Sequence, residues 1–223
     1  MTVAAVVLAA GRGARFARRD HKLTERVRGR SLVEWAIAAA VDSGLAPVLV
    51  VVGRRGRKVA RLVPHEVDVV RSRRWRRGIA HSLHAALDAL EHDPSVEAVC
   101  VGLADQPLVG GAAYARLARA HADGATLAVA TYDGQRANPV LLDRTLWREA
   151  RTLRGDVGAR ALMRDHPVTE VDCTDTGSPA DVDTLDDLRA IERASAWEGV
   201  ADRTRAADRA RAAEEERDRD ADH

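Results

Sequence analysis

Glycines and basic residues gather directly after the first apolar run of the chain. Val3–Leu8 leads into the segment AAGRGARF at residues 9–16, and Lys22 follows six residues later. The backbone N–H groups of such a turn can point together at phosphate oxygens, and glycine lets the ligand approach the backbone closely. Arg12, Arg15 and Lys22 add the positive charge that a triphosphate requires. The segment therefore predicts a phosphate-binding loop.

Two well-known phosphate loops do not fit this pattern. A dinucleotide-binding fingerprint needs a third glycine where this chain has Phe16, and an acidic residue after the second strand, where Gly53 stands. A Walker A loop places lysine directly after its last glycine, whereas alanine and arginine follow Gly13. The alternative that these glycines only turn the chain stays open at this point.

An aspartate follows a second strongly apolar run. Val96–Leu103 has the pattern of a buried strand, and Asp105 comes directly after it. The carboxyl ends of parallel strands meet at one edge of a sheet, so Asp105 is expected close to the glycine-rich loop. Mg²⁺ is commonly held by one or two carboxylates together with substrate phosphate oxygens and water. Asp105 is thus a candidate magnesium ligand, and its alternative role is that of a turn residue before Pro107.

A second group of acids lies near the end of the chain, in the segment DVDTLDDL at residues 181–188. Asp181 and Asp183 precede the last predicted helix and are candidate metal ligands beside Asp105. Thr184 is expected to cap that helix, and the two aspartates of its first turn are expected only to complement the helix dipole.

The segment GDVGAR at residues 155–160 combines a glycine-rich turn with the predicted start of a helix and an arginine. Such a helix start can bind an anion, so the segment is a candidate site for the phosphate of an acceptor molecule. An ordinary capped helix, with Asp156 satisfying its first N–H groups and Arg160 in solvent, is the alternative.

Short apolar runs alternate with segments of helical spacing, which predicts an α/β fold with a mostly parallel central sheet and helices on both faces. Ser31 and Glu34 form a capping-box pattern, and Gly44 marks the expected end of that helix. The expected strands are Val3–Leu8, Val48–Val52, Val67–Val70, Val96–Leu103, Thr126–Ala130, Pro139–Leu142 and Val168–Val171. The expected helices are Leu32–Ser43, Arg55–Leu62, Ala80–Leu90, Ala112–Ala122, Arg144–Leu153 and Ala159–Arg164.

Composition narrows the function further. The net charge of the 223-residue chain is +1 and its aromatic content is 3%, so neither a basic face nor stacking side chains favour nucleic acid as a partner. No apolar run approaches the roughly 20 residues of a membrane span, and the N-terminus lacks a signal-peptide pattern, so a cytoplasmic protein is expected. Cys100 and Cys173 form no metal-binding or disulfide pattern and are expected to be buried thiols.

The composition also divides the chain. Residues 1–193 are expected to form one domain, and residues 194–223 a charged helical or disordered tail rich in Ala, Arg, Asp and Glu. Within the 35 basic residues, lysine occurs only at Lys22 and Lys58. A position that keeps lysine is therefore a good candidate for a role that arginine cannot fill.

Taken together, five motifs resemble the molybdenum-cofactor cytidylyltransferase family. They occur in the order found in that family and span about residues 3 to 193. They are Leu8-Ala9-Ala10-Gly11-x-Gly13-x-Arg15 with Lys22, Gly78-Ile79-Ala80-x-Ser82-Leu83, Leu103-Ala104-Asp105-Gln106-Pro107-Leu108-Val109, Gly155-Asp156-Val157-Gly158-Ala159-Arg160 and Asp181-Val182-Asp183-Thr184.

The resemblance implies a Rossmann-like nucleotidyltransferase fold and Mg²⁺-dependent transfer of CMP from CTP to the phosphate of molybdopterin, with release of pyrophosphate. It implies catalytic roles for Lys22, Arg15 and Asp105, and a metal site at Asp105 with Asp181 and Asp183. It places the acceptor near Asn138, Asp156 and Arg160, and a molybdenum enzyme could receive the product. The nucleotide would contact Leu8, Ala9, Ala10, Gly11, Arg12, Gly13, Lys22, Ser82 and Asp105.

Two alternatives stand beside this reading. A related nucleotidyltransferase could use GTP or another nucleoside triphosphate, with a different phosphorylated small molecule as acceptor. A non-catalytic nucleotide-binding protein would bind without turnover. The presence of Lys22, Asp105 and the segment 181–184 argues against the second, since binding alone does not need a metal at the α-phosphate.

Overall fold

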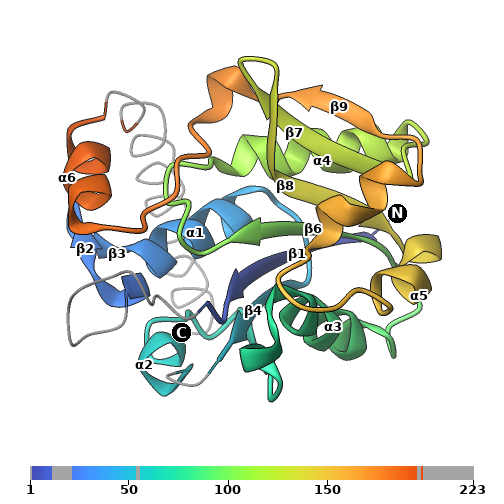
Figure 1. The fold of residues 1–223 in the computed structure, drawn as a ribbon, viewed down its shortest axis with the longest axis horizontal. Helices are drawn as coiled ribbons and strands as arrows, with labels where there is room; N and C mark the ends of the chain where they lie inside the picture. The colour runs from blue at the N-terminus through green and yellow to red at the C-terminus, as the bar shows by residue number, and fades with distance from the viewer. Residues whose placement is uncertain (1, 12–21, 54–55, 195–196, 198–223) are drawn as a thin grey trace, which may run out of the picture.

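The computed structural model describes residues 2–11, 22–53, 56–194 and 197. Seven strands form one sheet in the order β5-β4-β1-β6-β8-β7-β9, and all of them run in the same direction except β8, which is antiparallel to both neighbours (Figure 1). The prediction of a mostly parallel sheet is confirmed. The strands are β1 (Thr2–Ala9), β4 (Val48–Val52), β5 (Asp68–Arg71), β6 (Val96–Leu103), β7 (Leu127–Tyr132), β8 (Gln135–Asp143) and β9 (Thr169–Asp172).

Helices cover the sheet on both faces. One buried cluster contains Ala5 and Val7 of β1 together with residues of α1 and α4, and the other contains Ala4 and Val6 of β1 with residues of α3 and α5. Because alternate residues of β1 enter different clusters, this strand is apolar at every position from Val3 to Ala9, as is typical of a central parallel strand. The helices are α1 (Leu32–Asp42), α2 (Gly56–Ala60), α3 (Ile79–Leu90), α4 (Gly111–Ala122), α5 (Trp147–Ala150) and α6 (Leu185–Arg193).

Shorter elements connect this framework. A two-stranded ribbon precedes α1, and single 3₁₀ turns stand between the larger elements. The ribbon strands are β2 (Arg26–Val27) and β3 (Arg30–Ser31), and the 3₁₀ turns are η1 (Lys22–Thr24), η2 (Trp75–Arg77), η3 (Arg144–Leu146), η4 (Ala159–Arg164) and η5 (Thr174–Thr176).

The helix ends follow the sequence signals. Ser31 caps α1 in a full capping box with Glu34, and Gly44 follows the helix with a φ of +73°, so both signals for α1 are confirmed. Thr184 caps α6 in the same way, with Asp187 at the third helical position. Figure 1 shows α6 beside the β2–β3 ribbon, away from the edge strand β9.

Three predicted elements differ in the structure. The helix expected over 144–153 is a 3₁₀ turn followed by four residues of α-helix, and the segment 159–164 is 3₁₀ throughout. The strand expected over 139–142 is longer, at Gln135–Asp143, and antiparallel. Its direction follows from the two-residue turn Asp133-Gly134, where both residues have positive φ, as the tight turn of a hairpin requires.

A third buried cluster holds the last helix against the ribbon and α1. Trp197 is completely buried, and its ring centroid lies 4.6 Å from that of Trp35. Val182 and Ile191 belong to the same cluster. Since Trp197 lies beyond residue 193, the packed core includes a residue of the segment expected to be a tail. Within the described residues, no helix is long and apolar enough to cross a bilayer.

Candidate active site

The segment that follows β9 runs back along the carboxyl end of β6. The backbone N–H of Ser178 donates to the carbonyl of Leu108, at 3.0 Å, and that of Val182 donates to the carbonyl of Asp105, at 2.9 Å. Val182 itself is completely buried. This buried anchor fixes Asp181 and Asp183 on either side of it. The two acids therefore lie at the same sheet edge as Asp105, although more than seventy positions separate them from it in the sequence.

Among the described residues, Lys22 supplies a positive charge at this edge. Its ammonium group donates to Asp105 at 2.8 Å and to Asp183 at 3.0 Å, and its side chain is only 7% exposed. Burial acts to lower the pKa of Lys22, but the charges and hydrogen bonds of the two carboxylates outweigh it, and the pKa is raised. Lys22 is therefore charged at neutral pH and is held in place by two partners.

Asp181 lies at the rim of the same cluster. Its side chain is exposed enough to reach solvent, yet its pKa is raised, first by partial desolvation and then by the negative charges of Asp105 and Asp183. Lys22 and a hydrogen bond from Gln106 oppose this rise without cancelling it. The carboxylates thus carry more negative charge than the one lysine neutralises.

This donor set suits a divalent cation that shares its ligands with a substrate. Counting only the described residues, three carboxylates around one ammonium leave a formal surplus of two negative charges. Among the described residues, no group of three His, Cys, Asp or Glu side chains is arranged to hold a metal ion alone. A cation held by Asp105 with Asp181 or Asp183 would complete its coordination with phosphate oxygens and water, as Mg²⁺ commonly does.

Gln106 joins this cluster to the neighbouring strand, and sequence reasoning assigned it no role. It is 4% exposed. Its amide nitrogen donates to the carbonyl of Pro179 at 2.8 Å, and its amide oxygen accepts from Asn138 at 3.0 Å. The sequence signal was present, because an amide directly after a strand-end acid lies at the same sheet edge.

A cavity of about 190 Å³ opens beside the cluster. Its apolar lining comes from α3 and from strands β1, β6 and β8, and its polar lining comes from Asn138, Asp156 and Arg160. The structure thus brings together the three residues predicted to bind the acceptor, and Leu8 of the first strand reaches the same cavity. The N-cap residue of η4 is Gly158 rather than Asp156, whereas Arg160 is exposed, as the capped-helix alternative expected.

The described residues include part of the predicted nucleotide-binding site. Ala9 and Ala10 are buried at the carboxyl end of β1 and Gly11 is exposed, whereas Arg12, Gly13 and Arg15 lie outside the described residues. Ser82 is buried, at 3% exposure, in the first turn of α3. A side chain at Gly53 would come within 2.9 Å of the Ala10 carbonyl, which closes the position where a dinucleotide site needs an acid.

Gly78 and Gly155 hold α3 against residues 155–160, the segment predicted to bind the acceptor. The backbone N–H of Ala80 donates to the carbonyl of Gly155 at 3.2 Å. Gly78 has a φ of +104°, and a Cβ there would lie 2.1 Å from the Gly155 carbonyl group. Only glycine allows these two backbone segments to approach so closely. Asp156, next to Gly155, is placed in the cavity by this contact.

Comparison with known proteins agrees with this geometry. The chain is 33% identical over 198 residues to nicotine blue oxidoreductase of Paenarthrobacter nicotinovorans, which covers 83% of this chain and 94% of the relative. It is 31% identical to the bifunctional protein GlmU of Maricaulis maris over 67% of this chain, but it spans only 32% of GlmU.

Solved structures agree as well. Rv0371c of Mycobacterium tuberculosis H37Rv superposes with a TM-score of 0.73 and 28% identity, over 86% of this chain and 98% of Rv0371c. A complex of Rv0371c with manganese gives a TM-score of 0.71 and 26% identity, over 87% of this chain and 100% of that one. Residues 5–171 match the MobA-like NTP transferase domain. These similarities support a nucleotidyltransferase that uses a nucleoside triphosphate, and the chain belongs to the family of the MobA-like NTP transferase domain.

Proposed function

We propose that the protein transfers CMP from CTP to the phosphate of molybdopterin and releases pyrophosphate. The observation that carries the proposal is the joining of two features at one sheet edge. Lys22 lies between Asp105 and Asp183, and the neighbouring cavity is lined by Asn138 and Arg160 among others. The first feature suits a triphosphate with a metal ion, and the second suits an acceptor that carries a phosphate group.

In the proposed reaction, an oxygen of the acceptor phosphate attacks the α-phosphorus of the nucleotide in line. A phosphorus–oxygen bond forms to the acceptor, and the bond to the pyrophosphate group breaks, so pyrophosphate leaves with the bonding electrons. The attacking oxygen is already ionised at neutral pH, and no general base is required. Catalysis then rests on positioning and on stabilisation of charge.

Lys22 supplies the fixed positive charge. An ammonium group has three N–H donors, and Asp105 and Asp183 accept two of them. The third can donate to a phosphate oxygen as negative charge gathers on it. Arg15, from the glycine-rich loop, is proposed to act on the same phosphates. Because Lys22 is already oriented by two carboxylates, it needs little reorganisation when charge develops.

The carboxylates provide the metal site of the proposal. A divalent cation held by Asp105 with Asp181 or Asp183 would neutralise phosphate charge and polarise the phosphorus–oxygen bonds. We propose Mg²⁺, and the manganese complex of Rv0371c supports a divalent cation in a protein of this fold. The product would pass to a molybdenum enzyme in the cytoplasm. The alternative within this family is GTP or another nucleotide with a different phosphorylated acceptor.

The test is pyrophosphate release by the purified protein with Mg²⁺ and each of CTP, GTP, ATP and UTP, with and without molybdopterin. Release that requires both CTP and molybdopterin supports the proposal. Release with a different nucleotide, or binding of one nucleotide without release in the presence of molybdopterin, contradicts the assigned substrates while the nucleotidyltransferase family stands.

A second candidate function comes from the relative named an oxidoreductase, because the match covers 94% of that protein. Such a reaction needs an electron donor, and a reduced nicotinamide cofactor is the simplest choice to test. The dinucleotide fingerprint is absent at Phe16 and Gly53, which favours nucleotidyl transfer. Decolourisation of nicotine blue by the protein with a reduced nicotinamide cofactor, without pyrophosphate release from any nucleotide, would favour the oxidoreductase.

A further inference from the structure

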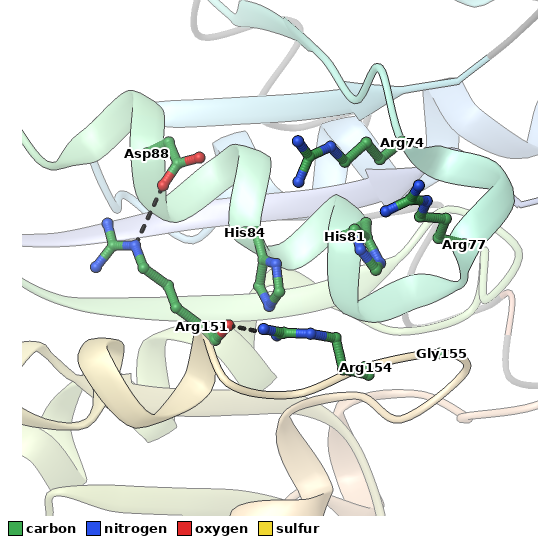
Figure 2. A pocket seen from close by; sticks show the side chains of 8 residues that line it. All are labelled: Arg74, Arg77, His81, His84, Asp88, Arg151, Arg154 and Gly155. Atoms are coloured by element: carbon green, nitrogen blue, oxygen red, sulfur yellow. Dashed lines mark hydrogen bonds and ion pairs between the residues drawn. The ribbon is translucent and has the colours of Figure 1, made fainter.

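A second, strongly basic pocket lies on the other side of residues 155–160 from the cavity that Asn138, Asp156 and Arg160 line. Its volume is about 640 Å³, and Figure 2 shows its side chains gathered around the outer face of α3. The lining comes from three separate parts of the chain, namely η2, α3 and the segment between α5 and η4. It consists of Arg74, Arg77, His81, His84, Asp88, Arg151, Arg154 and Gly155.

The positive charge of this pocket is only partly compensated. Arg151 is paired with Asp88 at 3.1 Å and also with Glu91. Figure 2 shows this pair at the end of the pocket away from Arg77. Arg154 donates only to main-chain carbonyls, those of Arg151 and Leu153, each at 2.8 Å. Its charge therefore meets no carboxylate among the described residues.

The other end of the pocket carries two more cations. Arg74 and Arg77 are exposed and form no ion pair with any described residue. In Figure 2 their side chains lie on one side of the histidine rings, and Arg154 lies on the other. Three guanidinium groups therefore line one space in which the lining carboxylate, that of Asp88, is already paired with Arg151. Like charges that face one space repel one another, and a bound anion would reduce that cost.

The histidines of α3 add donors to the floor of the pocket. Their ring centroids are 5.3 Å apart, as expected for positions i and i+3 of a helix. His84 uses Nε2 to contact the carbonyl of Ala150 at 3.1 Å. The Nδ1 atom of His81 is buried and has no hydrogen-bond partner within the described part of the chain.

We propose that this pocket binds a small molecule carrying two or more linked phosphate groups, at a site separate from the catalytic carboxylate cluster. Guanidinium groups bind phosphate through paired N–H donors, which three converging arginines can supply to a diphosphate group. The site is concave, and the net formal charge of the whole chain is only +1. Both features favour a small anion over nucleic acid as the ligand. The inference does not depend on the proposed transferase reaction.

The test uses inorganic pyrophosphate as the probe, titrated calorimetrically into metal-free protein at low ionic strength with a chelator present. The double variant Arg74→Ala/Arg154→Ala is expected to weaken binding at least about tenfold, since it removes two guanidinium groups that would donate charged hydrogen bonds to the phosphate oxygens. Arg148→Ala, which removes an exposed arginine of α5 outside the pocket, is the matched control and should change the affinity less than twofold.

Lys22→Met separates this site from the catalytic cluster. If the pocket is the site, pyrophosphate binds Lys22→Met as it binds the unmodified protein. Loss of binding in Lys22→Met with retention in the double variant would overturn the proposal, as would equal losses in Arg148→Ala and the double variant. The last titration replaces pyrophosphate with tricarballylate, a tricarboxylate. Binding of tricarballylate without binding of pyrophosphate would overturn the phosphate assignment.

Discussion

Replacement of Lys22 by methionine removes the positive charge between two carboxylates. The Lys22 ammonium lies 2.8 Å from Asp105 and 3.0 Å from Asp183. Coulomb's law with an effective dielectric constant of about 20 gives about 6 kcal/mol for each pair. Desolvation of the ammonium offsets much of this, and the carboxylates are 29% and 34% exposed, so water screens what remains. We expect Lys22→Met to lower the free energy of unfolding by about 2–3 kcal/mol.

The assay is urea unfolding at pH 7.5 in metal-free buffer. The raised pKa of Lys22 means that its stabilising effect is present below the ordinary lysine pKa and is lost only as the pH rises through the folded-state pKa. The full difference should therefore appear at pH 7.5. Lys58→Met, which replaces the exposed second lysine, is the control. An equal free energy of unfolding for Lys22→Met and the unmodified protein would refute the electrostatic argument.

A divalent cation adds a second readout to the same experiment. The surplus charge of Asp105, Asp181 and Asp183 grows when Lys22 is removed, so Mg²⁺ or Mn²⁺ should narrow the stability difference by binding the folded state. If the cation stabilises neither protein, the carboxylates do not hold a divalent cation in the absence of a nucleotide. A nucleotide is not needed for this measurement, which keeps it independent of the choice of substrate.

Three further predictions test other parts of the site. Asp105→Asn should lower turnover at least about 100-fold in a protein that still folds, because its carboxylate serves the phosphates and the metal; it should lower the free energy of unfolding by less than Lys22→Met does, since Asp183 still pairs with Lys22, and near-normal turnover would exclude the assigned role. Asp181→Asn should stabilise the metal-free protein by a few tenths of a kcal/mol at neutral pH, a modest gain because the side chain is exposed. Since the pKa of Asp181 is raised, the gain should vanish as the pH falls through its folded-state pKa, and a gain that persists in acid would contradict the charge argument. Gly78→Ala should lower the unfolding temperature far more than Gly124→Ala. The two glycines have similar φ, +104° and +102°, but only a Cβ at Gly78 would strike the Gly155 backbone. Equal effects would mean that both variants report only backbone strain, about 1–3 kcal/mol each, and would exclude the clash.

The central part of the fold was predictable from the sequence because its signals are local. Runs such as Val48–Val52 are apolar at every position, and Ser31 with Glu34 marks the start of α1. The direction of β8 was missed although Asp133-Gly134 is a strong hairpin signal. Of the helix expected over 144–153, only Trp147–Ala150 is α-helical and a 3₁₀ turn precedes it, because spacing alone does not separate a 3₁₀ turn from an α-helix.

The candidate site was predictable where it depends on strand ends. Asp105 lies two residues after the end of β6, and its approach to Lys22 follows from the shared edge of a parallel sheet. The course of the segment before α6 could not be derived, because it depends on burial of Val182 and Trp197 in a cluster formed by distant residues. For the same reason the basic pocket was not foreseen, since Arg74 and Arg154 are brought together only by tertiary packing.

The distribution of lysine gains a physical explanation from the structure. Lysine occurs at only two of the 35 basic positions, yet one of them is the buried cation of the site. An ammonium is compact, and it can donate to two carboxylates and still hold one N–H for a third oxygen. A guanidinium is planar and larger, and at a position with 7% exposure it would bring five donors that need partners. The geometry therefore explains why lysine is present at position 22 in a chain whose basic residues are otherwise nearly all arginine.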